Sequence, residues 1–289
     1  MAPSRSLEYE KGSLAHVSIK GRFVDISESL KAAENSLRDL LNFVLSNELG
    51  EDWFRSCGVS DGRVEEWEKR KSVDEKKFGH ADPRMIYYAD FYDLKTIVRH
   101  NWNRGLSDVF GKLKELEILL GLLDDLRNPD AHRRELLPYQ RHLALGISGK
   151  IRSKITEYFC KMETGKSYYS RIESVQDSLG NTWAIGERNS LDTGCVLRPG
   201  DQLQFKVVGA DPLGEPLEFA TLPMVAPHEF SWSSHGDFDL TIESNHIQEK
   251  LWIFIAVRSR REFHAKSAPW LGKVDDIVKF GYEVLPPRR

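Results

Sequence analysis

The stretch LEILLGLLDDLRNPDAH, residues 116–132, joins a leucine-rich run to a polar hexapeptide. Pro129 interrupts it, because a proline clashes with the residue four positions earlier and biases the preceding Asn128 away from helical geometry. The pattern therefore predicts a buried helix that kinks or restarts at Asn128-Pro129. The apolar side chains that recur at helical spacing are Leu113, Leu116, Ile118, Leu119, Leu120, Leu122, Leu123 and Leu126.

This break decides how two functional side chains are presented. On an unbroken helix, five residues at about 100° each would separate Arg127 and His132 around the axis. A kink at Pro129 would let both reach one cleft. Histidine, with an ordinary pKa of about 6.5, serves as acid or base near neutrality. Arginine offers a planar, permanently charged fork that matches phosphate oxygens.

Amphipathic patterns around this stretch predict a helical N-terminal half. A first helix begins near Ser27 or Ser29, either of which can cap it, and ends around Gly50. Charge dominates residues 61–80, which predicts a solvated helix or a mobile excursion. The remaining predictions are a strand or extended arm at His16–Val24, a short continuation at Glu51–Arg55 that buries two aromatics, a helix over Ala89–Trp102 ended by Asn103-Arg104-Gly105, and a helix over Tyr139–Met162 weakened by Gly146 and Gly149.

The pattern changes around residues 163–166. From Ser167 onward, short apolar or aromatic runs alternate with turn residues, which is typical of a β-sandwich of about seven strands. The fold class is thus multidomain α and β, with a helical domain at 1–165, a short linker, and an all-β domain at 167–289. The runs are Tyr168–Ile172, Cys195–Leu197, Leu203–Val208, Phe219–Leu222, Phe238–Ile242, Leu251–Val257 and Phe280–Val284.

Composition bounds the class of protein. The 289 residues, 40% hydrophobic and 29% charged, suit two globular domains, and the net charge of −3 gives no global sign of nucleic-acid or membrane affinity. Cys57, Cys160 and Cys195 are widely separated, as in reduced cytosolic proteins. No apolar run approaches the roughly 20 residues of a membrane helix, and the first residues lack the apolar core of a signal peptide. We expect a cytoplasmic protein with no membrane partner.

The helical half resembles the HEPN superfamily (higher eukaryotes and prokaryotes nucleotide-binding domain) over a core of residues 27–163. The family's arginine, four to six residues and then a histidine correspond to Arg127 and His132. The segments Glu34–Leu40, Gly50–Trp53 and Asp90–Lys95 through Asn101-Trp102 resemble a subgroup found at the end of a yeast nuclear-RNA quality-control endoribonuclease. That subgroup also occurs in bacterial proteins suspected of antiphage defence.

This resemblance implies a helical bundle that acts as a homodimer and cleaves RNA without a metal or other cofactor. An isologous dimer would bring two Arg–His pairs into one cleft, and so supply both the acid and the base. The products implied are 2′,3′-cyclic phosphate and 5′-hydroxyl ends. The β half is similar to immunoglobulin-like modules at Leu197–Phe205 and Phe280–Pro286, which mostly bind or space other molecules.

Positive charge is concentrated from the motif onward. Residues Arg127 to Lys154 contain seven Lys and Arg but only two acidic residues. Such local charge favours an RNA-facing surface, with Asn128, Arg133 and Arg134 as candidate substrate-binding residues. Each has a structural alternative. Asn128 can be a cap or turn residue. The basic residues Arg133 and Arg134, and likewise Lys150 to Lys154, can belong to a solvated helix face that binds nothing. For Arg127 the alternative is an ion pair with a carboxylate such as Asp124, and for His132 a capping or core role.

Other motifs are weaker. Gly146–Lys150 resembles a phosphate-binding loop, but no strand precedes it and Ala144 occupies the place of the first glycine. The histidines of the β half, His228, His235 and His246, have no cysteine or paired carboxylates at ligand spacing, so no metal is expected there. Aromatics near Arg258, Arg260 and Arg261 suit either a stacking surface for single-stranded nucleic acid or a sandwich core. They are Trp232, Trp252, Phe263 and Trp270.

The leading hypothesis is a dimeric endoribonuclease with Arg127 and His132 as catalytic residues, RNA as substrate, and a β domain that recognises a protein partner or controls the nuclease. The subgroup suggests a role in antiphage defence or in a toxin system. The rival is a non-catalytic HEPN module that binds RNA, a nucleotide or a protein. A third hypothesis is a purely structural adaptor.

Overall fold

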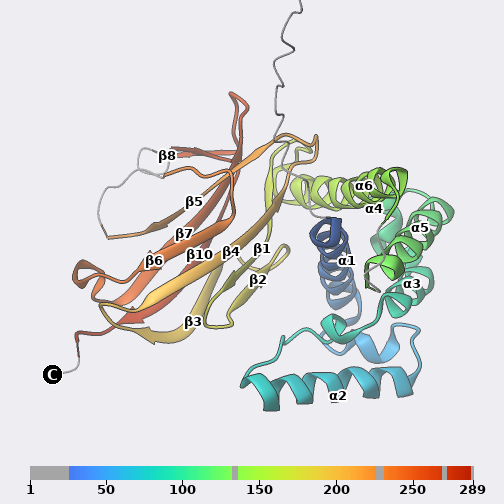
Figure 1. Ribbon diagram of the computed structural model, residues 1–289, viewed down its shortest axis with the longest axis horizontal. Helices are drawn as coiled ribbons and strands as arrows, with labels where there is room; N and C mark the ends of the chain where they lie inside the picture. The colour runs from blue at the N-terminus through green and yellow to red at the C-terminus, as the bar shows by residue number, and fades with distance from the viewer. Residues whose placement is uncertain (1–25, 132–135, 226–230, 269–271, 288–289) are drawn as a thin grey trace, which may run out of the picture.

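The computed structural model describes residues 26–131, 136–225, 231–268 and 272–287. The first half of this described chain is helical (Figure 1). Its helices are α1 (Ile26–Leu49), α2 (Asp61–Phe78), α3 (Phe91–His100), α4 (Ser107–Phe110), α5 (Leu113–Ala131) and α6 (Pro138–Thr164). Short turns η1 (Trp53–Ser56), η2 (Met85–Tyr88) and η3 (Trp102–Leu106) connect them.

The helices predicted from periodicity are confirmed, with small differences at their ends. Ser27 and Ser29 lie inside α1 rather than before it, so neither is its N-cap. The charged stretch forms α2, a solvated helix that buries only Val64 and Trp67. The predicted break before α4 is confirmed at Gly105, whose φ of +88° is a conformation that glycine adopts without strain. The arm predicted at 16–24 lies outside the described residues.

The break predicted at Asn128-Pro129 is wrong, because α5 continues through both residues to Ala131 as one helix. A proline removes one backbone N–H, here the donor that would reach the carbonyl of Asp125. So close to the described end of the helix, the loss is a single hydrogen bond. Burial of four leucines along α5 outweighs it; they are Leu116, Leu120, Leu123 and Leu126. The glycines of α6 likewise leave that helix unbroken.

The second half forms two four-stranded sheets. The first has the order β2 (Thr182–Ala184), β1 (Arg171–Asp177), β4 (Gln202–Ala210) and β6 (Asp237–Thr241). The second has the order β3 (Ser190–Leu197), β10 (Asp276–Val284), β7 (Gln248–Ser259) and β5 (Leu217–Pro223), with β3 parallel to β10 and the other pairs antiparallel. A hairpin of β8 (Lys266–Ala268) and β9 (Gly272–Val274) is separate.

These sheets pack face to face as a sandwich. Phe205 of β4 meets Phe280 of β10 edge to face, with ring centroids 5.8 Å apart, and the Tyr282 hydroxyl donates to Asp177 Oδ2 at 2.7 Å. All seven predicted runs overlap strands. The strands β2, β8 and β9 were missed because three residues are too few to show an alternating pattern.

The two halves meet where α6 packs against β1 and β4 of the first sheet, and α1 contacts the same strands through Ser36 and Glu28 (Figure 1). Glu173 of β1 is buried there and accepts hydrogen bonds from Ser36 of α1, at 2.8 Å, and from the guanidinium of Arg152 on α6. Arg152 also donates to the carbonyl of Gly209 at 2.9 Å. A buried charge is stable only when paired, so these contacts fix how the sandwich sits on the helices.

Across the described residues, no helix is both long enough and apolar enough to cross a membrane.

Candidate functional site

Arg127 lies in the last turns of α5, in contact with α1 and α3. Its Nε is 2.9 Å from Glu34 Oε2, and its Nη1 is 3.7 Å from Asp124 Oδ1. The guanidinium carbon lies 4.7 Å from the centre of the Phe91 ring, within cation–π range. One third of the side chain (33%) remains exposed. Arg127 is therefore held on one side while part of it faces solvent.

Glu34 is the nearer of the two carboxylates and is itself buried. Arg38, one turn later on α1, approaches its other oxygen, with Nη2 2.6 Å from Oε1. Arg38 also donates to the carbonyls of Ile86 and Ala89, which anchor it to the turn before α3. Glu34 thus bridges two arginines.

A second cation, Lys95 of α3, lies on the other side of Asp124. Its Nζ is 2.5 Å from Asp124 Oδ2 and 5.9 Å from the centre of the Phe91 ring. We refer to Glu34, Arg38, Lys95, Asp124 and Arg127, gathered around Phe91, as the Arg127 cluster. Three cations against two carboxylates give it a formal charge of +1. Such a cluster favours an anion at its exposed edge.

The remaining predicted site residues are not placed. His132, Arg133 and Arg134 lie outside the described residues, and for Asn128 only the helical backbone is described. Whether Arg127 and His132 converge therefore stays a prediction. The contact of Arg127 with Asp124 is the structural alternative foreseen from the sequence, although Glu34 is the closer partner.

Some of the cations that follow the motif are neutralised by ion pairs in the structure. Arg152, counted with the solvated face of the last helix, instead pairs with buried Glu173 at the junction of the halves. Lys154 pairs with Glu157 at 3.2 Å. Arg141 and Lys150 are exposed. Of the four described cations between residues 136 and 154, these two are exposed and have no carboxylate of a described residue within ion-pair distance, whereas Arg152 and Lys154 are paired.

Sequence reasoning missed Glu34 and Lys95 as members of a site, and it named Asp124 only as an alternative ion-pair partner of Arg127. One signal was present for Glu34, which lies in the buried stripe of α1 between Leu30 and Leu37. An acid on the apolar face of a helix needs a buried partner. Lys95 and Asp124 carry no comparable signal, because charged residues on helices are mostly solvated.

Two cavities lie at the junction of the halves, of about 450 Å³ and about 230 Å³, and Arg84 lines both. Asp39 of α1 lines the smaller one. Its Oδ1 accepts hydrogen bonds from Arg84 Nη1 at 3.1 Å and from the Tyr87 hydroxyl at 2.8 Å. Burial raises the pKa of Asp39 to about 7, against the opposing effect of Arg84 and Tyr87 and with help from nearby Glu173.

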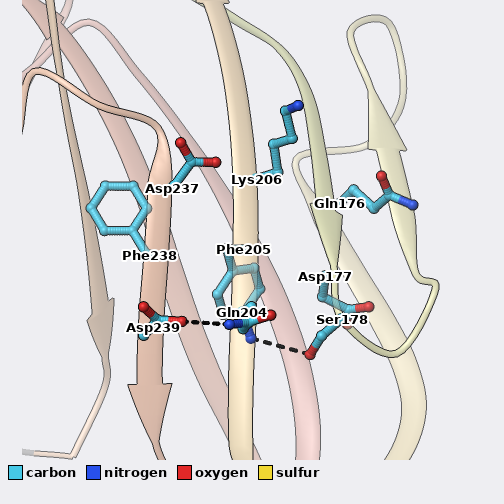
Figure 2. Close-up of a pocket in the computed structure, with 9 residues that line it drawn as sticks. All are labelled: Gln176, Asp177, Ser178, Gln204, Phe205, Lys206, Asp237, Phe238 and Asp239. Carbon is cyan, nitrogen blue, oxygen red and sulfur yellow. Dashed lines mark hydrogen bonds between the residues drawn. The ribbon is translucent and has the colours of Figure 1, made fainter.

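Figure 2 shows a third cavity, of about 340 Å³, on the first sheet. Side chains of β1, β4 and β6 line it. Gln204 donates to Asp239 at 2.8 Å, and Lys206 lies 3.6 Å from Glu28 of α1. These polar groups already bond to one another or to α1. The Arg127 cluster is therefore the stronger candidate.

No protein-family model, no curated protein and no solved structure significantly matches this chain. Among the described residues, no three or more His, Cys, Asp or Glu side chains are grouped so as to hold a metal ion.

The raised pKa of Asp39 predicts a pH-dependent stability. A carboxyl whose pKa is higher in the folded than in the unfolded chain stabilises the fold at low pH, and this contribution is lost as pH rises toward about 7. Relative to Asp39→Asn, the wild type should lose free energy of unfolding between pH 5 and pH 8, as measured by urea denaturation at each pH.

Asp192→Asn is the control, because Lys250 lowers the pKa of exposed Asp192 and its titration falls below this range. The free energy of unfolding of Asp192→Asn should change between pH 5 and pH 8 by the same amount as that of the wild type. A difference between wild type and Asp39→Asn that stays constant from pH 5 to pH 8 would contradict the assignment.

Proposed function

We propose that this chain is a metal-independent endoribonuclease of the HEPN type, acting as a dimer, with Arg127 and His132 at a composite site. The observation that carries the proposal is the setting of Arg127. Glu34 and the Phe91 ring hold its guanidinium, while a third of the side chain faces solvent. An arginine that is already held in position and partly exposed can stabilise the negative charge that develops on a phosphate in the transition state.

In the proposed reaction the ribose 2′-oxygen attacks the adjacent phosphorus, and the bond to the 5′-oxygen breaks. His132 of one protomer accepts the 2′-hydroxyl proton, and the partner's His132 donates a proton to the leaving 5′-oxygen. Arg127 neutralises the charge that develops on the non-bridging oxygens. The products are a 2′,3′-cyclic phosphate and a 5′-hydroxyl. The resemblance to the HEPN family supplies this chemistry.

The proposed dimer is supported by apolar side chains left exposed on the helices. Ile118 and Leu122 lie one turn apart on α5, opposite its buried leucines, and are 57% and 36% exposed. Leu143 and Tyr139 are exposed one turn apart on α6. A second copy of the chain would remove this surface from water.

The β half is proposed to be an immunoglobulin-like module that recognises a protein partner or controls the nuclease. Its two packed, mostly antiparallel sheets support that assignment. The buried contacts of Glu173 with α1 and α6 give it a direct mechanical link to the helices. We place the protein in the cytoplasm, with antiphage defence or a toxin system as its proposed context.

A second candidate function is a HEPN module that binds RNA without cleaving it. The ion pairs of Arg127 with Glu34 and Asp124 favour it, because they satisfy the guanidinium without any substrate. Both functions predict RNA binding at the Arg127 cluster, and only the first predicts cleavage.

Incubation with total RNA in EDTA separates the two functions. The wild type should produce fragments with 2′,3′-cyclic phosphate ends, and Arg127→Ala and His132→Ala should each slow cleavage by at least roughly 100-fold. Arg127→Lys should also be slow, because an ammonium lacks the planar fork.

Arg55→Ala is the matched control, since Arg55 is exposed and paired with Glu68 on the surface of the same helical half. Its cleavage rate should equal that of the wild type. RNA binding without cleavage by the wild type would reject the nuclease and favour the binding module.

The dimer is tested by sedimentation of Leu122→Glu. The wild type should sediment as a dimer. The Leu122→Glu variant, with a charge on the exposed α5 face, should be monomeric and should not cleave RNA, because each site needs both protomers. Val73→Glu, at an exposed apolar position of α2, should leave both unchanged. A monomeric wild type that cleaves RNA would exclude the composite site.

A further inference from the structure

The first turn of α3 presents an aromatic ring to solvent beside the Arg127 cluster. Tyr92 is 70% exposed, the highest value among the large apolar and aromatic side chains that the structure describes as exposed. Its neighbour Phe91 is buried and lies under Arg127. A single exposed ring is common on protein surfaces, and it is its place beside a cluster of cations that makes Tyr92 a candidate stacking platform for a base.

Tyr92 stands on a rigid turn. Asp90 and Asp93 form a capping box at the start of α3, in which the Asp90 N–H donates to Asp93 Oδ2 at 3.0 Å. Buried Asp93 also accepts from Arg63 Nη2 at 2.7 Å and from Trp67 Nε1 at 3.0 Å, which ties this turn to α2. The backbone that carries Tyr92 is therefore fixed before any ligand arrives.

Cations continue from Tyr92 along the same face of α3. Lys95 follows Tyr92 by three residues, so the two side chains are neighbours on the helix surface. Asp124 accepts one bond from Lys95 at 2.5 Å, and an ammonium has three donors, which leaves two for another acceptor. Arg99, one turn further, is exposed and pairs with Glu117 of α5.

Helices α3 and α5 lie side by side at the end of the molecule away from the sandwich, with α1 between them and the sheets (Figure 1). Tyr92 and Lys95 are neighbours on α3, and Asp124 of α5 pairs with both Lys95 and Arg127. An alternation of ring and cation matches an alternation of base and phosphate.

We propose that Tyr92 and Lys95 form a nucleotide subsite for single-stranded RNA beside Arg127. The Tyr92 ring stacks on an unpaired base, and Lys95 binds the phosphate next to the one held by Arg127. A base inside a duplex has no free face, so the subsite selects single strands. This inference rests on the proposed RNA-cleaving function and names the form of its substrate.

The test is the affinity of a fluorescein-labelled 2′-O-methyl RNA 12-mer, which cannot be cleaved because its 2′-oxygen is blocked. Tyr92→Ala should weaken binding roughly 5- to 100-fold, the usual effect of removing one stacking ring. Tyr92→Phe should bind within about twofold of the wild type, since stacking needs the ring and not the hydroxyl. Lys95→Ala should lower the slope of log Kd against log salt by about 0.7.

Phe78→Ala is the matched control, because Phe78 is also a highly exposed aromatic but lies at the end of α2. It should bind like the wild type, and a duplex of the same sequence should bind Tyr92→Ala and wild type equally. Thermal unfolding of each variant confirms that the fold is intact. Wild-type affinity in Tyr92→Ala, an equal loss in Tyr92→Phe, or no binding by the wild type would each overturn the subsite.

Cleavage of unmodified RNA, measured in parallel, keeps the two proposals apart. A wild type that binds through Tyr92 but does not cleave would retain the subsite and reject the nuclease. A wild type that cleaves and whose Tyr92→Ala variant binds unchanged would retain the nuclease and reject the subsite.

Discussion

Helix α1 removes the carboxylate of Glu34 from water, and two arginines make that burial stable. A buried, unpaired carboxylate would be strongly unfavourable, so Arg38 and Arg127 are held where they are by the need to neutralise Glu34. Phe91 supports Arg127 from below, and Asp124 links it to Lys95. The position of the candidate catalytic arginine is thus a consequence of one acid on the buried stripe of α1.

The same helix anchors the sandwich. Ser36 donates a hydrogen bond to Glu173 of β1. Asp39, beside the cavities at the junction, accepts hydrogen bonds from Arg84 and Tyr87. A movement of β1 relative to α1 would break buried polar contacts, each worth more in this setting than on the surface. Helix α1 therefore connects the sandwich with the Arg127 cluster, because buried side chains of α1 bind both Glu173 and Arg127. This gives the proposed partner-binding domain a physical route to the proposed nuclease.

Local patterns predicted most of the architecture, because amphipathic periodicity is a property of neighbouring residues. The helices over α1, α3, α5 and α6 and seven strands followed from it, while Pro129 misled because a proline near a helix end costs little. Among the neighbours of Arg127, Asp124 was anticipated from the sequence as an ion-pair partner, whereas Glu34 and Lys95 were not. Lys95 and Asp124 are 29 residues apart, and Arg152 reaches Glu173 across the junction of the halves. Such pairs depend on packing that spacing does not reveal.

The most direct test of this account is a double-mutant cycle between Glu34 and Arg127, read as the single-turnover rate of RNA cleavage in EDTA. If Glu34 acts by positioning the guanidinium, Glu34→Gln should slow the wild type roughly 10-fold or more and change the rate of Arg127→Lys by less than about twofold. Equal slowing in both backgrounds, or none in either, would contradict the claim that this ion pair sets the candidate site.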